Sequence, residues 1–260
     1  MQEILCIYDK TDNFKFMERF TSFYVCIFIL YIGVSSCNFS LSPGMTGNGQ
    51  LISREIAIAD YAEIELNGAA NVIYEQKSAK APYLQVYIDE NLMPELDIKV
   101  DGERLVISPK SGKSLMPTQF KIYTNSRNLN HVQSNGTGDI HLKGEINAPR
   151  MSINIRGTGN VVSDSLYCEE IKVNMAGTGY ACLAGAANEA TLKLAGTGHI
   201  GAIEYFAQRL YAILSGTGDM EVRGSDYLEA VISGTGTIRY FGEPKEIERK
   251  ISGTGRLEQW

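Results

Sequence analysis

A chain of 260 residues, 44% of them hydrophobic, is long enough for one large domain or two small ones. Its net charge of −6, its isoelectric point near 5.2 and its lack of any basic run argue against a nucleic-acid partner. Glycine is frequent, at 26 residues, and more than half of these glycines belong to one repeated motif.

The first 36 residues have the pattern of a targeting segment rather than of a folded domain. Cations precede an apolar run over residues 20–34, which is short for a transmembrane helix and typical of a signal-peptide core. The run leads through small residues into Cys37, as at a bacterial lipoprotein cleavage site. We therefore expect residues 1–36 to be a signal peptide and Cys37 to carry a lipid that anchors the chain to a membrane.

Two alternatives for this segment stay open. It can be a simple membrane anchor, or a cleavable signal without a lipid. The true start is either Met1 or Met17, since Met17 gives a leader of more usual length. The following residues 37–50 are rich in Ser, Gly, Asn and Pro, and are expected to form a flexible tether. Together these segments place the protein in the cell envelope, in the periplasm or at the cell surface.

Residues 51–129 are expected to form entry strands that lead into the repeats. Short strands are predicted at residues 83–88, 96–100, 104–107 and 120–123. Asp101-Gly102 indicates a hairpin between two of them, and Pro94 weakens the one helical turn suggested by the sequence. Around Gly68 the apolar positions match those of the later repeats, so this stretch is interpreted as a degenerate copy with Gly-Ala-Ala in the motif.

The tripeptide Gly-Thr-Gly dominates residues 130–260. Its seven copies follow one another at steps of 18 to 21 residues, and their first glycines are Gly136, Gly157, Gly177, Gly196, Gly216, Gly234 and Gly253. This period fits one coil of a β-solenoid, in which each repeat buries its apolar face against its neighbours. We predict an all-β fold, a parallel β-helix or solenoid of about 20-residue coils, with residues 51–260 forming one solenoid domain.

Counted from the first glycine of each motif, the residues at positions −2, −4 and −6 are mostly apolar and the residue at position +4 is apolar in every copy. The residues that alternate with them are mostly polar. This period of two is typical of a strand with one buried face. The phase continues through the motif, so both glycines are expected to face a narrow coil interior at a bend. The threonines are expected to form one outward ladder: Thr137, Thr158, Thr178, Thr197, Thr217, Thr235 and Thr254.

The Gly-Ala-Ala-Asn-Val stretch that begins at Gly68 and the serial Ser-Gly-Thr-Gly-Asp/Asn coils resemble the auto-transporter adhesin head GIN domain family over residues 53–258. The resemblance implies a right-handed β-helix-like fold in a secreted or lipid-anchored protein, and no catalytic residues to transfer. The copies with Tyr180, His199, Thr237 or Arg256 after the motif depart from the family's Asp/Asn pattern.

The residues that directly follow each Gly-Thr-Gly motif form a column with few groups suited to metal binding or catalysis. Asp139 and Asp219 lie four copies apart, about 19 Å at strand spacing, so they cannot share a calcium ion. His199 and Asp219 are the one neighbouring pair with acid–base potential, and three-part catalytic constellations are absent from the sequence. We expect no metal, no cofactor and no catalytic residue. Cys168 and Cys182 stand in different columns and are expected to be separate thiols.

The sequence therefore predicts a non-enzymatic envelope protein that displays an adhesive or binding surface for a glycan or a protein. A structural scaffold and a polysaccharide-active β-helix enzyme stay open as alternatives. Tyr211, Ile213 and Val231 occupy outward positions on neighbouring coils and would form a contiguous apolar patch. We expect this patch either to mediate docking or homo-oligomer formation, or to be covered by a loop or by the entry strands of the same chain.

Overall fold

The computed structural model describes residues 44–78, 80–110 and 113–260. The predicted leader, Cys37 and the beginning of the predicted tether lie outside the described residues. Within the described part, no helix is long and apolar enough to span a bilayer.

The described residues form an all-β structure, as predicted, with a single turn of 3-10 helix at Met93–Glu95. The entry region contains nine strands: β1 (Met45–Thr46), β2 (Leu51–Ile56), β3 (Glu63–Leu66), β4 (Asn71–Gln76), β5 (Tyr83–Asp89), β6 (Leu96–Asp101), β7 (Arg104–Pro109), β8 (Leu115–Met116) and β9 (Phe120–Ser126). The repeats form nine more: β10 (His131–Ser134), β11 (Ile140–Ile155), β12 (Val161–Met175), β13 (Tyr180–Leu194), β14 (His199–Leu214), β15 (Asp219–Ile232), β16 (Thr237–Phe241), β17 (Glu246–Ile251) and β18 (Arg256–Gln259).

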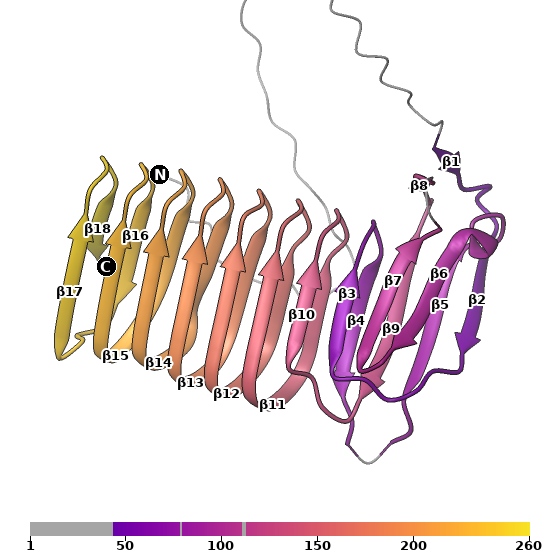
Figure 1. Cartoon of the computed structure of the whole chain (residues 1–260), viewed down its shortest axis with the longest axis horizontal. Helices are drawn as coiled ribbons and strands as arrows, with labels where there is room; N and C mark the ends of the chain where they lie inside the picture. Colours follow the sequence, from indigo (N-terminus) through magenta and orange to yellow (C-terminus); the bar gives the residue numbers. More distant parts are fainter. Residues whose placement is uncertain (1–43, 79, 111–112) are drawn as a thin grey trace, which may run out of the picture. The chain divides into compact units, whose positions relative to one another are not determined.

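The repeats stack as the coils of a parallel β-solenoid (Figure 1). Equivalent residues of successive coils pair in register, as Val173 of β12 does with Leu192 of β13, which in turn pairs with Ala212 of β14. All three side chains are buried. Their apolar faces form a continuous core along the axis, because no single coil could bury its own.

In β12 and β14 the inward–outward alternation slips by one residue at two points along the strand. In β12 the inward side chains are Val161, Ser163, Leu166, Cys168, Ile171, Val173 and Met175, so two intervals are of three residues instead of two. A coil therefore has three sides. Counting by twos from the motif gives the correct face only on the two sides next to the Gly-Thr-Gly turn.

The motif is a turn between two long strands, as expected, but the reason for its glycines differs from the prediction. A Cβ on any of the fourteen motif glycines would lie less than 3.0 Å from the carbonyl oxygen of the equivalent residue one coil before. None of them has a positive φ. Glycine is required because successive turns stack backbone on backbone. The narrow interior contributes only at some second glycines, such as Gly218, where a Cβ would also crowd Leu194.

All seven threonines of the motif are exposed, so the outward ladder is confirmed. Their backbone amides also join the coils. The N–H of Thr217 donates to the carbonyl oxygen of Gly196 at 3.1 Å, and four other motif threonines make the equivalent bond: Thr137, Thr158, Thr178 and Thr235.

The entry strands lie at one end of the stack and begin it (Figure 1). β3 and β4 pair in parallel with β10 and β11, and the Gly136 turn stacks directly on Gly68, which confirms the degenerate copy. The four predicted strands are present as β5, β6, β7 and β9. β6 and β7 form the predicted hairpin, with Gly102 at φ +63°.

Residues 44–50 are part of the folded domain, so the predicted tether is wrong for this half of its length. β1 pairs with β8, and the N–H of Gly49 donates to Asp89 Oδ1 at 2.8 Å. Asp89 is fully buried, and its Oδ2 accepts a second backbone hydrogen bond from Thr118 at 2.7 Å. This carboxylate holds the segment around Gly49 and the loop at Thr118 together.

The two cysteines of the solenoid are not joined to each other. Cys168 is a free, partly buried thiol, and burial raises its pKa to about 11. Cys182 takes part in a disulfide, so the prediction of two separate thiols is wrong for this residue.

Candidate binding surface

Tyr211, Ile213 and Val231, here called the interface patch, lie on the side of the solenoid that precedes the motif. Ile213 of β14 pairs directly with Val231 of β15, and Tyr211 lies two residues before Ile213 on the same face. All three are partly exposed, whereas Ala212 and Leu214, which alternate with Tyr211 and Ile213 along the strand, are buried. The register thus brings the three predicted side chains together.

Charged residues bound the interface patch along the solenoid axis. Lys193 pairs with Ile213 on one side, and Lys250 pairs with Val231 on the other. Glu229 pairs with Tyr211 and accepts a hydrogen bond from Lys250 at 2.6 Å. The apolar area is therefore small and has a charged rim.

Two residues that the sequence analysis missed enlarge this surface. The Tyr227 ring lies 5.8 Å from the Tyr211 ring. The Arg209 guanidinium lies 5.2 Å from the Tyr227 ring centre and donates to the Tyr211 hydroxyl at 3.0 Å. Arg209 and Tyr227 stand at a bend of the coil, beyond the positions that the motif counting covered, so no simple spacing would have found them.

The column after the motif joins coils by hydrogen bonds. Asp139 Oδ1 accepts from the backbone and side-chain nitrogens of Asn160 at 2.9 and 2.8 Å. Asn160 Oδ1 accepts in turn from the Tyr180 amide at 2.9 Å, and Asp219 Oδ1 from the Thr237 amide at 2.8 Å. Aspartate and asparagine here cap a backbone N–H of the next coil, which gives the Asp/Asn pattern a structural role.

Across the described residues, no group of three or more His, Cys, Asp and Glu is arranged to hold a metal.

His199 is placed beside Asp219 by the strand register, but its ring is directed to a different carboxylate. His199 Nε2 lies 3.8 Å from Glu221 Oε2, and Glu221 also lies 3.6 Å from Arg239. Burial lowers the pKa of His199, and the nearby Glu221 opposes this effect. The Asp219 carboxylate accepts from the Thr237 amide, and the side chain that faces the His199 Nε2 is Glu221, which also lies near Arg239.

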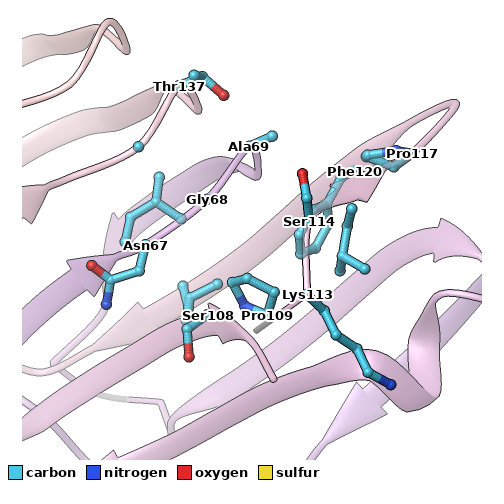
Figure 2. A pocket seen from close by; sticks show the side chains of 14 residues that line it. Asn67, Gly68, Ala69, Ser108, Pro109, Lys113, Ser114, Pro117, Phe120 and Thr137 are labelled. Carbon is cyan, nitrogen blue, oxygen red and sulfur yellow. The ribbon is translucent and has the colours of Figure 1, made fainter. Parts of the chain in front are cut away.

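A cavity of about 250 Å³ lies at the entry end of the solenoid (Figure 2). The turn at Gly68 and Ala69 borders it, together with Pro109 and Phe120. Lys113, at its margin, forms an ion pair with Glu95. The volume is below the usual range for a small-molecule site, and the lining offers few converging polar groups.

A stack of parallel coils with polar, hydrogen-bonded turns defines a β-solenoid repeat protein whose outer faces are available for contact. The chain belongs to the family described as "Putative auto-transporter adhesin, head GIN domain", whose model matches residues 60–244. This agrees with the resemblance seen in the sequence.

Solved structures of related proteins have the same fold. A "putative adhesin" from Bacteroides fragilis is 26% identical, with a TM-score of 0.79 over 84% of this chain and 100% of that chain. A "putative lipid binding protein" from Parabacteroides distasonis is 34% identical, with a TM-score of 0.72 and the same coverage. A "putative adhesin" from Parabacteroides merdae is 25% identical, with a TM-score of 0.66 over 84% of this chain and 99% of that chain. No curated protein matches the sequence.

Proposed function

We propose that this chain is a lipid-anchored protein of the cell envelope that acts as a non-enzymatic adhesin. The family and two of the related structures carry the adhesin name, which suggests this role and a place in the envelope. In this proposal Cys37 carries the lipid, and the solenoid presents its outer faces to a glycan or protein partner.

The interface patch is the observation that carries this proposal. Along its column the outward residues of earlier coils are polar, as at Asn154 and Asn174, which hydrogen bond to each other at 3.0 Å. Ile213 and Val231 replace that polar ladder by apolar side chains on a rigid sheet. Partly exposed apolar groups with a neighbouring tyrosine and arginine are typical of protein contacts. We infer that this patch mediates self-association or docking.

The proposal is tested by presenting the full chain, purified in detergent, to an array of glycans and to intact host cells. Selective retention without any chemical change of the bound partner supports an adhesin. Turnover of a bound polysaccharide would instead support an enzyme and overturn the proposal. Failure to retain any array component or cell would overturn it in favour of a scaffold.

A further inference from the structure

A column of exposed aromatic side chains follows the third side of the solenoid, the side farthest along the chain from the motifs. Strand register places Tyr167, Ala186, Phe206, Arg223 and Phe241 at equivalent positions of five successive coils. Tyr167 is 44% exposed and Phe206 is 50% exposed. We call these five residues, with Trp260, the aromatic column.

Trp260 extends this column by one coil. Its ring stacks on Phe241, with the ring centres 5.4 Å apart and an angle of 26° between the planes, and the residue is 59% exposed. The N–H of Trp260 donates to the carbonyl oxygen of Tyr240 at 3.0 Å, so the last ring is held in the register of the coils.

The strand register fixes the spacing of the rings. Tyr167 and Phe206 lie two coils apart, about 9.6 Å at strand spacing, and Phe241 lies a further two coils along. Ala186 stands between the first two rings and is too small to cover either of them. The Arg223 guanidinium lies 4.8 Å from the Phe206 ring centre. Among the described residues, its buried Nε has no hydrogen-bond partner.

Polar side chains border the rings on the same outward face. Glu204 and Gln208 are exposed two residues before and after Phe206, and Glu169 is exposed two residues after Tyr167. Tyr167 and Phe206 therefore each have hydrogen-bonding groups beside the ring. The interface patch is different, since its apolar side chains are less exposed and bounded by charges along the axis.

This arrangement fits a sugar chain better than a protein surface. A sugar ring has an apolar C–H face that stacks on an aromatic ring and hydroxyl groups at its edge that need polar partners. The interval of two coils is close to the length of one disaccharide unit of an extended β-linked glycan, so alternate sugars would meet successive rings. The carboxylates of Glu169 and Glu204 would repel an acidic sugar.

We propose that the aromatic column is a binding site for a neutral, extended glycan that lies along the solenoid axis. This inference rests on the proposed adhesin function and names the chemical class of its ligand. Tyr167 and Phe206 supply the stacking surfaces, and Gln208 and Arg223 supply donors to sugar hydroxyls.

The test uses the full chain and isothermal titration with β-1,4-linked hexasaccharides of glucose, N-acetylglucosamine, mannose and xylose, each compared with its disaccharide. At least one hexasaccharide is expected to bind more tightly than its disaccharide, because only the longer chain reaches two rings. Tyr167→Ala and Phe206→Ala are each expected to weaken the hexasaccharide about tenfold and to remove the advantage of length. Tyr87→Ala, which removes a partly exposed aromatic ring from entry strand β5, is the matched control and should bind as the parent chain does.

Three results would overturn the inference, and melting temperatures identify variants that simply unfold. Hexasaccharide binding that survives both column substitutions would show that the glycan site lies elsewhere, while the adhesin proposal would stand. Binding of none of the four sugars, together with selective retention on host cells, would show that the ligand class is wrong. A fall in molecular mass by light scattering on Phe206→Ala would show that a second copy of the chain covers the column.

Discussion

The carbonyl oxygen of Gly196 faces the Cα of Gly216 across one coil, so closely that a Cβ on Gly216 would lie less than 3.0 Å from it. The obstacle is backbone, which cannot rotate away as a side chain can. This contact recurs at every Gly-Thr-Gly turn, so the turns of successive coils stack backbone on backbone.

Gly216→Val is therefore expected to destabilise the fold by about 3 kcal/mol, through overpacking against the preceding turn. Thr217→Val is the matched control, because Thr217 is exposed and joins the coils through its backbone amide. It should cost about 1 kcal/mol at most. Equal free energies of unfolding in urea for both variants would contradict the stacking explanation.

The Asp219 carboxylate provides a second test, because its Oδ1 accepts the Thr237 amide of the next coil. Asp219→Ala leaves this N–H without its side-chain acceptor and is expected to cost about 1 to 2 kcal/mol of stability. Asp219→Asn keeps an acceptor oxygen in place and should retain most of the stability. A denaturant melt that ranks the asparagine variant as low as the alanine variant would mean that charge, and not the cap, is what matters.

The hydrogen bonds that the Asp89 carboxylate accepts from the Gly49 and Thr118 amides should weaken in acid. Desolvation of the buried carboxylate acts to raise its pKa, but hydrogen bonds from the Thr118 and Gly49 amides outweigh this effect and hold the pKa below its usual value. A lowered folded-state pKa means that the stabilisation is present above the unfolded-state pKa and is lost as the pH falls through the folded-state value. Hydrogen exchange at Gly49 and Thr118 should therefore accelerate in acid relative to the motif turns.

Asp89→Asn is the control for the role of this carboxylate. The variant cannot titrate at this position, so exchange at these two amides should be faster at neutral pH and should lose its additional acid dependence. Protection in the parent chain that is constant relative to the motif turns over the acid range would contradict the role of the carboxylate.

The interface patch predicts a change in self-association. Ile213→Lys combined with Val231→Lys places two positive charges where the patch is apolar, and is expected to reduce the mass measured by light scattering without a large loss of melting temperature. Thr191→Lys, next to Tyr211 in the preceding coil, is the control and should leave the mass unchanged. An unchanged mass with a collapsed melting temperature would show that Ile213 and Val231 serve the core of a single chain.

The lipid anchor is tested at Cys37, which is expected to be the mature N-terminus. Cys37→Ala should abolish labelling by a palmitate analogue and shift the protein out of the detergent phase. Ser36→Ala keeps a small residue before the cysteine and should be labelled as before. Persistent labelling of the alanine variant at position 37 would end the lipoprotein hypothesis.

The amino-acid sequence by itself determined the repeating part of the fold. The regular return of Gly-Thr-Gly and the apolar positions around it predicted parallel coils, exposed threonines and a degenerate first turn at Gly68, and the structure confirms all three. These features follow from a period of two and from the step between copies, both of which are local properties of the chain. The pairing of Ile213 with Val231 also followed, because both residues lie close to their motifs.

Only the tertiary structure decided which side chains lie outward on the far side of each coil. Counting by twos from the motif would bury Phe206 and expose Tyr205, yet Phe206 is 50% exposed and Tyr205 is 1% exposed. The alternation slips at the two bends, whose positions depend on how neighbouring coils stack. For the same reason the partner of His199 and the clasp made by Asp89 were not predicted. Contacts between distant segments depend on where the backbone bends in space, and no pattern within a single coil encodes that.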